Sequence, residues 1–146
     1  MEERHSLEQV INSDHRIALL EGENTEHFVG LFKRLTLTTG RAVYDWNPEH
    51  GLYRLGIEHI FIPRTRTPAD VLAYISSSRH YGIYLLRTFD EAVNKPAVER
   101  LLLKLAEKQD GVRRLVFLMG QKLALPASLA PYSVAVSTER ARENAG

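Results

Sequence analysis

The sequence contains no cysteine. This absence excludes disulfides, thiolate nucleophiles and every cysteine-based zinc site. No segment near its beginning joins a basic start to an apolar stretch of about 7–15 residues, which is the pattern of a secretory signal. We therefore expect a cytoplasmic protein.

Long apolar runs and an excess of one charge are missing as well. The longest runs, such as residues 115–119, are far shorter than the roughly 20 residues that a helix needs to cross a bilayer. Lys and Arg number 19 against 18 Asp and Glu, which argues against non-specific attraction to nucleic acid or to an anionic membrane. We expect neither a membrane span nor a nucleic-acid partner.

The residues that are present have the composition of an ordinary folded domain. Of the 146 residues, 44% are hydrophobic and 25% are charged. A chain of this length buries roughly 70% of its unfolded surface around a single core. We expect one domain over residues 1–137 and a polar tail over residues 138–146.

Strand-like and helix-like patterns alternate along the chain. Short, mainly apolar segments typical of buried strands occupy residues 16–20, 42–46, 83–86, 115–119 and 133–136. Helical spacing of apolar residues appears at residues 7–11, 28–35, 67–75 and 96–109, and a single helical turn is expected within residues 125–131. Residues 52–55 are either a short strand or a loop, and residues 57–67 show no period. The pattern predicts an α/β fold, a three-layer α/β/α sandwich with a mostly parallel sheet of about five core strands.

Open α/β sheets bind ligands at the carboxyl ends of their strands. The turn after the first expected strand stands where a P-loop places glycines, a lysine and a hydroxyl residue around phosphates. The required Gly-Lys-Ser/Thr is absent from the whole sequence, and Glu21, Glu23 and Glu26 lie in this region instead. Their charge would repel a triphosphate, although acidic residues in a first helical turn also complement the helix dipole. We expect no ATP hydrolysis.

The strand ends offer few other catalytic groups. Asp90 and Glu91 resemble the acidic pair that binds magnesium in ATPases, but Arg87 and Thr88 separate them from the strand, so we expect them to begin or cap a local turn. The histidines lack metal-ligand spacing, and we expect no metal site. An enzyme that uses Asp45, Asp90 or Glu91 as acid or base is the remaining catalytic alternative.

Two binding hypotheses remain open. Gly22, Asn24, Thr88 and Gln121 follow different strands and could hold a nucleotide or small anion without hydrolysing it. We assign no cofactor. Trp46, the single tryptophan, either packs in the core, which we favour, or forms an aromatic contact surface for a partner.

The order of the elements resembles a known family. The matching stretches are residues 42–46 with Gly51 and Leu52 after them, 68–75, 82–86, 96–106 and 115–119 followed by 125–129. Together they cover about residues 14–137. They resemble the N-terminal region of the AAA-type ATPases found in cyanobacteria and plastids under the label of a hypothetical chloroplast reading frame.

The resemblance implies a RecA-type P-loop fold whose own nucleotide motifs are eroded, followed in the family by an AAA module that carries the ATPase. Within these 146 residues we expect no such module. Thr88 stands where the family tends to keep an acidic residue, which argues further against a magnesium site. The implied role is non-catalytic, a protein-binding or regulatory module whose partner is a second copy, as in a homodimer, or an ATPase chain.

Overall fold

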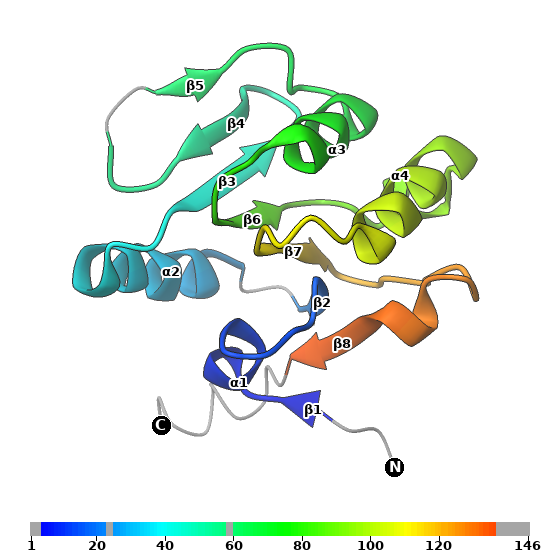
Figure 1. The fold of residues 1–146 in the computed structure, drawn as a ribbon, viewed down its shortest axis with the longest axis horizontal. Coiled ribbons are helices and arrows are strands. Elements are labelled where there is room, and N and C mark those ends of the chain that lie inside the picture. Colours follow the sequence, from blue (N-terminus) through cyan, green and yellow to red (C-terminus); the bar gives the residue numbers. More distant parts are fainter. Residues whose placement is uncertain (1–3, 23–24, 58–59, 137–146) are drawn as a thin grey trace.

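The computed structural model describes residues 4–22, 25–57 and 60–136 (Figure 1). The α-helices are α1 (Leu7–Ile11), α2 (Thr25–Thr39), α3 (Pro68–Ser77) and α4 (Pro96–Glu107), with 3-10 turns η1 (Ala92–Asn94) and η2 (Ala130–Tyr132). The strands are β1 (Arg4–His5), β2 (Ile17–Glu21), β3 (Val43–Asn47), β4 (Gly51–Arg54), β5 (Phe61–Ile62), β6 (Gly82–Leu86), β7 (Arg114–Gly120) and β8 (Ser133–Val136).

The strands form one mixed sheet in the order β1-β8-β2-β7-β6-β3-β4-β5. In this order, the neighbouring strands from β1 across the sheet as far as β3 all pair in parallel. β4 pairs antiparallel with β3, and β5 pairs antiparallel with β4. Five of the six parallel strands, β8, β2, β7, β6 and β3, are those that the apolar segments of the sequence predict. The predicted mostly parallel sheet is confirmed, and an antiparallel hairpin extends it at one edge.

Helices cover both faces of the sheet (Figure 1). α3 and α4 lie on one face and α1 and α2 on the other, and each pair shares a separate core with the strands. Alternate residues of β6 divide between these cores, since Tyr84 and Leu86 face α3 and α4 while Ile83 and Leu85 face α2. This is the predicted three-layer α/β/α arrangement, and it is consistent with a P-loop-like core.

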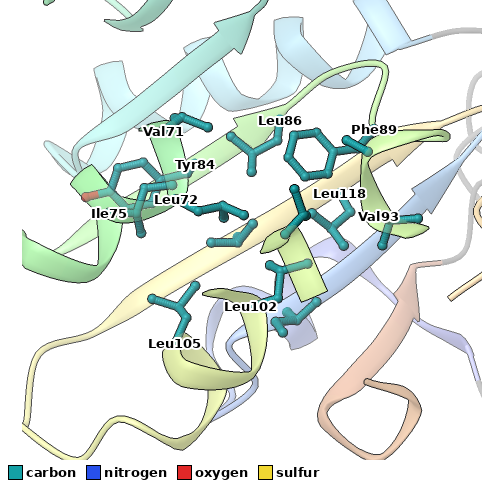
Figure 2. Close-up of a cluster of buried hydrophobic side chains, with 14 of the residues drawn as sticks. Val71, Leu72, Ile75, Tyr84, Leu86, Phe89, Val93, Leu102, Leu105 and Leu118 are labelled. Carbon is teal, nitrogen blue, oxygen red and sulfur yellow. The ribbon is translucent and has the colours of Figure 1, made fainter. Parts of the chain in front are cut away.

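The core beneath α3 and α4 is built from the apolar positions that helical spacing marks. Figure 2 shows Val71, Leu72 and Ile75 of α3 and Leu102 and Leu105 of α4 directed toward the side chains of β6 and β7. All five are at most 1% exposed. The spacing of apolar residues in the sequence therefore identifies the face of each helix that packs against the sheet.

Local sequence signals fix several element ends. Ser6 and Gln9 form a reciprocal capping box at the start of α1, with bonds of 3.2 and 2.9 Å. Thr67 accepts a 3.0 Å bond from the Asp70 amide at the start of α3. Gly40 ends α2 with φ +72°, the left-handed conformation that glycine adopts without strain.

The sequence does not predict the shortest elements. Residues 52–55, left open between strand and loop, belong largely to β4, and β5 lies inside the segment that shows no period. The helical turn expected within residues 125–131 forms only from Ala130 onward, as η2. A strand of two residues contains a single alternation, so no periodic signal can mark it. The tail expected over residues 138–146 lies outside the described residues.

Arginine side chains satisfy the carboxyl ends of three helices. Arg16 donates to the carbonyls of Leu105 (3.1 Å) and Ala106 (3.2 Å) at the end of α4. Arg113 reaches the last carbonyls of α1, and the buried Arg114 donates to the carbonyl of Ser78 after α3. Because α1 and α3 have no basic residue in their last turns, these distant guanidinium groups supply the positive charge that the helix dipole favours there.

In the part of the chain that the structure describes, every helix is too short or too polar to span a membrane.

Replacing Leu102 by alanine tests the packing of α4. The side chain is fully buried, so we expect Leu102→Ala to lower the free energy of unfolding by about 2–5 kcal/mol in urea titrations. Leu37→Ala is the matched control, since Leu37 is 78% exposed and its loss should change stability by less than about 0.5 kcal/mol. Equal effects of the two substitutions would contradict the assignment of the inward face.

The ion pair between Arg114 and Asp110 predicts a pH dependence of stability. Asp110 accepts bonds of 3.0 and 2.8 Å from Arg114, which hold the pKa of Asp110 far below its usual range. A lowered folded-state pKa stabilises the fold fully above the ordinary aspartate value of about 4, and this contribution disappears as the pH falls below it. We expect Asp110→Asn to be destabilising at pH 6 and nearly neutral at strongly acidic pH, measured by urea unfolding. A difference independent of pH would contradict the role of this pair.

Candidate functional site

A polar hollow of about 510 Å³ lies at the carboxyl ends of the central strands. The segments after β2, β3, β6 and β7 contribute to its lining. Three of the residues predicted to bind a nucleotide or anion, Gly22, Thr88 and Gln121, line it together. The fourth, Asn24, lies outside the described residues.

Arg87, directly after β6, is the centre of the charge network beside this hollow. Its guanidinium group donates two bonds to the carboxylate of Asp45 on β3, of 2.8 and 2.6 Å. A further bond reaches Glu26 in the first turn of α2. Asp45 is 2% exposed and Glu26 is 75% exposed, so one partner is buried and the other is in solvent.

The ionisation of this network follows from its burial and its charges. Burial alone would lower the pKa of Arg87, but the bonds to Asp45 and Glu26 outweigh burial and raise it. Tyr53 on β4 is the register partner of Asp45, and burial together with the negative charge of Asp45 raises the pKa of its hydroxyl group. Arg87 therefore stays a cation, and two carboxylates already neutralise it.

Two other carboxylates hold the loop that follows β7. Glu21 accepts a 2.8 Å bond from the amide of Leu123, and Asp90 accepts a 2.8 Å bond from the amide of Lys122. Asp90 and Glu91 begin the turn that leads into η1, as expected. Asp90 bonds across the sheet edge, and Glu91 makes no capping bond to η1 among the described residues.

The described glutamates of the acidic turn after β2 make contacts within the protein. Glu21 supports the neighbouring loop and Glu26 pairs with Arg87, while Glu23 lies outside the described residues. Glu26 also stands in the first turn of α2, where the helix dipole favours a negative charge.

Gly120 lets Asp90 reach its position. A Cβ atom at residue 120 would lie 2.6 Å from both carboxylate oxygens of Asp90, closer than real contacts allow. The glycine that ends β7 therefore makes room for the carboxylate, which then binds the next turn of the chain.

Thr88 has an unusual backbone for its residue type. Its φ of +52° lies in the left-handed region, which β-branched residues avoid at a cost of about 1–3 kcal/mol. The turn that it makes brings the amide of Phe89 to the carbonyl of Met119, at 2.9 Å. Such strain persists only where the surrounding structure fixes it, as the adjacent bonds of Arg87 and Phe89 do.

Trp46 packs in the core, as we favoured, and the aromatic contact surface is wrong. It is 1% exposed, donates its indole N–H to the carbonyl of Thr65, and meets Phe89 edge to face at 5.5 Å. Its neighbour Tyr44 stacks on Tyr84 inside the same face of the sheet.

The chemistry available in the hollow is limited. Its charged lining residues are Glu49, Arg87 and Asp90, and Arg87 is engaged by two carboxylates. Asp45 has both oxygens bound to Arg87, so it is poorly placed to transfer a proton to a ligand. Over residues 4–22, 25–57 and 60–136, no group of three or more histidine and carboxylate side chains is placed to bind a metal ion.

Sequence reasoning named Arg87 and Asp45 but missed their pairing at this edge. Arg87 stands directly after one buried strand and Asp45 lies near the end of another, so their pairing could be inferred once the two strands are placed side by side. The glycine that ends the apolar run of β7 is a second signal, because a strand glycine often marks a close approach of another group.

The fold and this edge define a class, an α/β domain with a P-loop-like core. Residues 3–138 match the family described as SpoVK-like AAA ATPase, N-terminal domain, and the chain belongs to this family. Neither the curated proteins nor the solved structures give a significant match.

Substitutions at Arg87 test the charge network. Arg87→Met leaves Asp45 as a buried carboxylate without its counter-charge, and we expect a loss of about 3–5 kcal/mol in the free energy of unfolding. Glu26→Gln is the control, because its exposed pair with the same guanidinium group should contribute less than about 1 kcal/mol. A loss of similar size in both variants, measured by urea denaturation, would show that Asp45 does not depend on Arg87.

Proposed function

We propose that this domain is a non-catalytic P-loop NTPase-like module that binds or regulates a protein partner. Membership of the N-terminal domain family of SpoVK-like AAA ATPases supports an association with an ATPase, which is either a separate chain or an assembly containing further copies of this one. A degenerate nucleotide site, of the kind implied by the resemblance to the cyanobacterial and plastid proteins, and a cytoplasmic location are parts of this proposal.

The proposal rests on one observation: the cation and the loop amides at the strand ends are already paired with carboxylates of the chain itself. A triphosphate requires free cations and free backbone amides. Here Arg87 is held by Asp45 and Glu26, and the amides of Lys122 and Leu123 are bound by carboxylates of the chain itself. An incoming phosphate would have to displace these groups and approach the negative charges of Glu21 and Asp90.

A second candidate is binding of a nucleotide or small anion without hydrolysis. The hollow lined by Gly22, Thr88 and Gln121 favours it, since four strand ends converge there. The exposed Glu26 could yield its place at Arg87 to a ligand carboxylate or phosphate, because that ion pair lies in solvent.

Calorimetric titration with ATP and magnesium, ADP and inorganic phosphate separates the two candidates. We expect no saturable heat, corresponding to dissociation constants weaker than about 1 mM, and no release of phosphate from ATP. Saturable binding that Thr88→Ala and Gln121→Ala weaken, without turnover, would favour the second candidate. Hydrolysis of ATP by the purified chain would refute the non-catalytic role.

A further inference from the structure

Arg87 makes two contacts of unequal strength beside the polar hollow. Its Nε and Nη2 atoms donate to the two oxygens of Asp45, at 2.8 and 2.6 Å, and the side chain of Asp45 is 2% exposed. Its remaining nitrogen, Nη1, donates to one oxygen of Glu26, whose side chain is 75% exposed. The first contact is therefore bidentate and buried, whereas the second is single and lies in solvent.

The contact with Glu26 is the one that can exchange. Exposed ion pairs favour contact over separation by a factor of about five at most, so Glu26 leaves Nη1 for a substantial fraction of the time. Asp45 stays bound, because separation would leave a buried carboxylate without its counter-charge. While Glu26 is away, Arg87 presents one free donor nitrogen to the hollow that it lines.

The group that fits this free donor is a single carboxylate. Arginine recognises phosphate best through a fork of two parallel bonds, and Asp45 already occupies such a fork on Arg87. A carboxylate that accepts one bond is what Glu26 supplies from within the chain. Because one carboxylate replaces another, the exchange leaves the net charge around Arg87 unchanged.

The other charges of the hollow favour a carboxylate over a phosphate. The lining includes Glu49 and Asp90, and neither forms an ion pair with another described residue. The exposed Lys122 follows the lining residue Gln121, and its amide binds Asp90. A phosphate ester carries about 1.5 to 2 negative charges at neutral pH and would be repelled more strongly by both acidic residues than a singly charged carboxylate.

We infer that Arg87 is the docking point for a glutamate or aspartate side chain of a partner protein, and that Glu26 occupies this position when the partner is absent. The inference rests on the proposed function as an interaction module and names the group that the module recognises. The hollow of about 510 Å³ is much larger than one carboxylate group, so neighbouring parts of a partner chain have room to enter it. Glu26 is an internal competitor, because its carboxylate must leave Nη1 before another can bind. Removal of its charge therefore strengthens binding.

Titrations of the isotope-labelled full chain, followed by NMR, test the inference. The probes are a pentapeptide with blocked ends and one central glutamate among glycines, the same peptide with glutamine, propanoate and inorganic phosphate. We expect the glutamate peptide to shift the amide signals of Gly22, Thr88 and Gly120, which line the hollow, and the glutamine peptide to shift none of them. Propanoate and phosphate should both bind more weakly than the glutamate peptide.

Matched variants separate exchange at Arg87 from a general effect of charge. Glu26→Gln should tighten binding of the glutamate peptide about threefold to fivefold, because its exposed ion pair no longer competes. Glu49→Gln removes the same charge from the same hollow without freeing Nη1, and it should change binding less than about twofold. Adding Arg87→Lys to Glu26→Gln should abolish the gain, because lysine keeps a positive charge for Asp45 but lacks the planar group that binds two carboxylates. The amide spectrum of each variant verifies that the fold is retained.

Several results would overturn the inference. The first is a glutamate peptide that shifts no signal of the hollow, even in Glu26→Gln, and the second is equal tightening by Glu26→Gln and Glu49→Gln. Propanoate that binds as tightly as the peptide would indicate a small carboxylate in place of a protein, and phosphate that binds more tightly would indicate a phosphate site. ATP hydrolysis alongside peptide binding would refute the non-catalytic role alone, whereas inert ATP without peptide binding would refute the carboxylate site alone.

Discussion

The bidentate ion pair between Arg87 and Asp45 determines which charged groups at the carboxyl edge of the sheet remain free to bind a ligand. It joins the ends of β6 and β3, and through Glu26 it reaches the first turn of α2. Because Asp45 is buried, the carboxylate needs this guanidinium group, and the guanidinium group is then no longer free for a phosphate. The same interaction that stabilises the edge therefore removes its main cation from phosphate binding.

Elsewhere the chain also uses its arginines for internal contacts. Arg16, Arg113 and Arg114 neutralise the carboxyl ends of α4, α1 and α3, at the edge of the sheet opposite the hollow. A P-loop core needs positive charge at the helix amino ends, where phosphates bind. Here carboxylates and strand-end amides are paired at that edge, while the guanidinium groups of one buried and two half-buried arginines bind the helix ends at the other. At both ends of the strands, charged side chains therefore bind groups of the protein itself and stabilise the fold.

The sequence predicted the parallel core because its strands are buried on both faces and their apolar runs are continuous, as in residues 83–86 and 115–119. It predicted the helix faces for a similar reason, since Val71, Leu72 and Ile75 recur at helical spacing. The site was harder to predict. Gly22, Thr88 and Gln121 could be grouped from the sequence because ligands bind at the carboxyl ends of parallel strands. The pairing of Arg87 with Asp45, and that of Asp90 with the amide of Lys122, depend on the order of the strands and the path of the loops. Local sequence patterns do not contain this information.

The elements that the sequence did not predict and the exposed apolar side chains at this sheet edge have one physical cause. The hairpin of β4 and β5 is short, and its residues alternate between a packed face and a face beyond α2, so they give no continuous apolar run. That same half-covered state leaves Phe61 and Ile57 exposed beside Leu37. In a domain whose cation and loop amides at the strand ends are paired with its own carboxylates, the uncovered extension is where apolar surface remains to be buried. Burial there requires no displacement of internal bonds at the sheet end, whereas phosphate binding would have to break several.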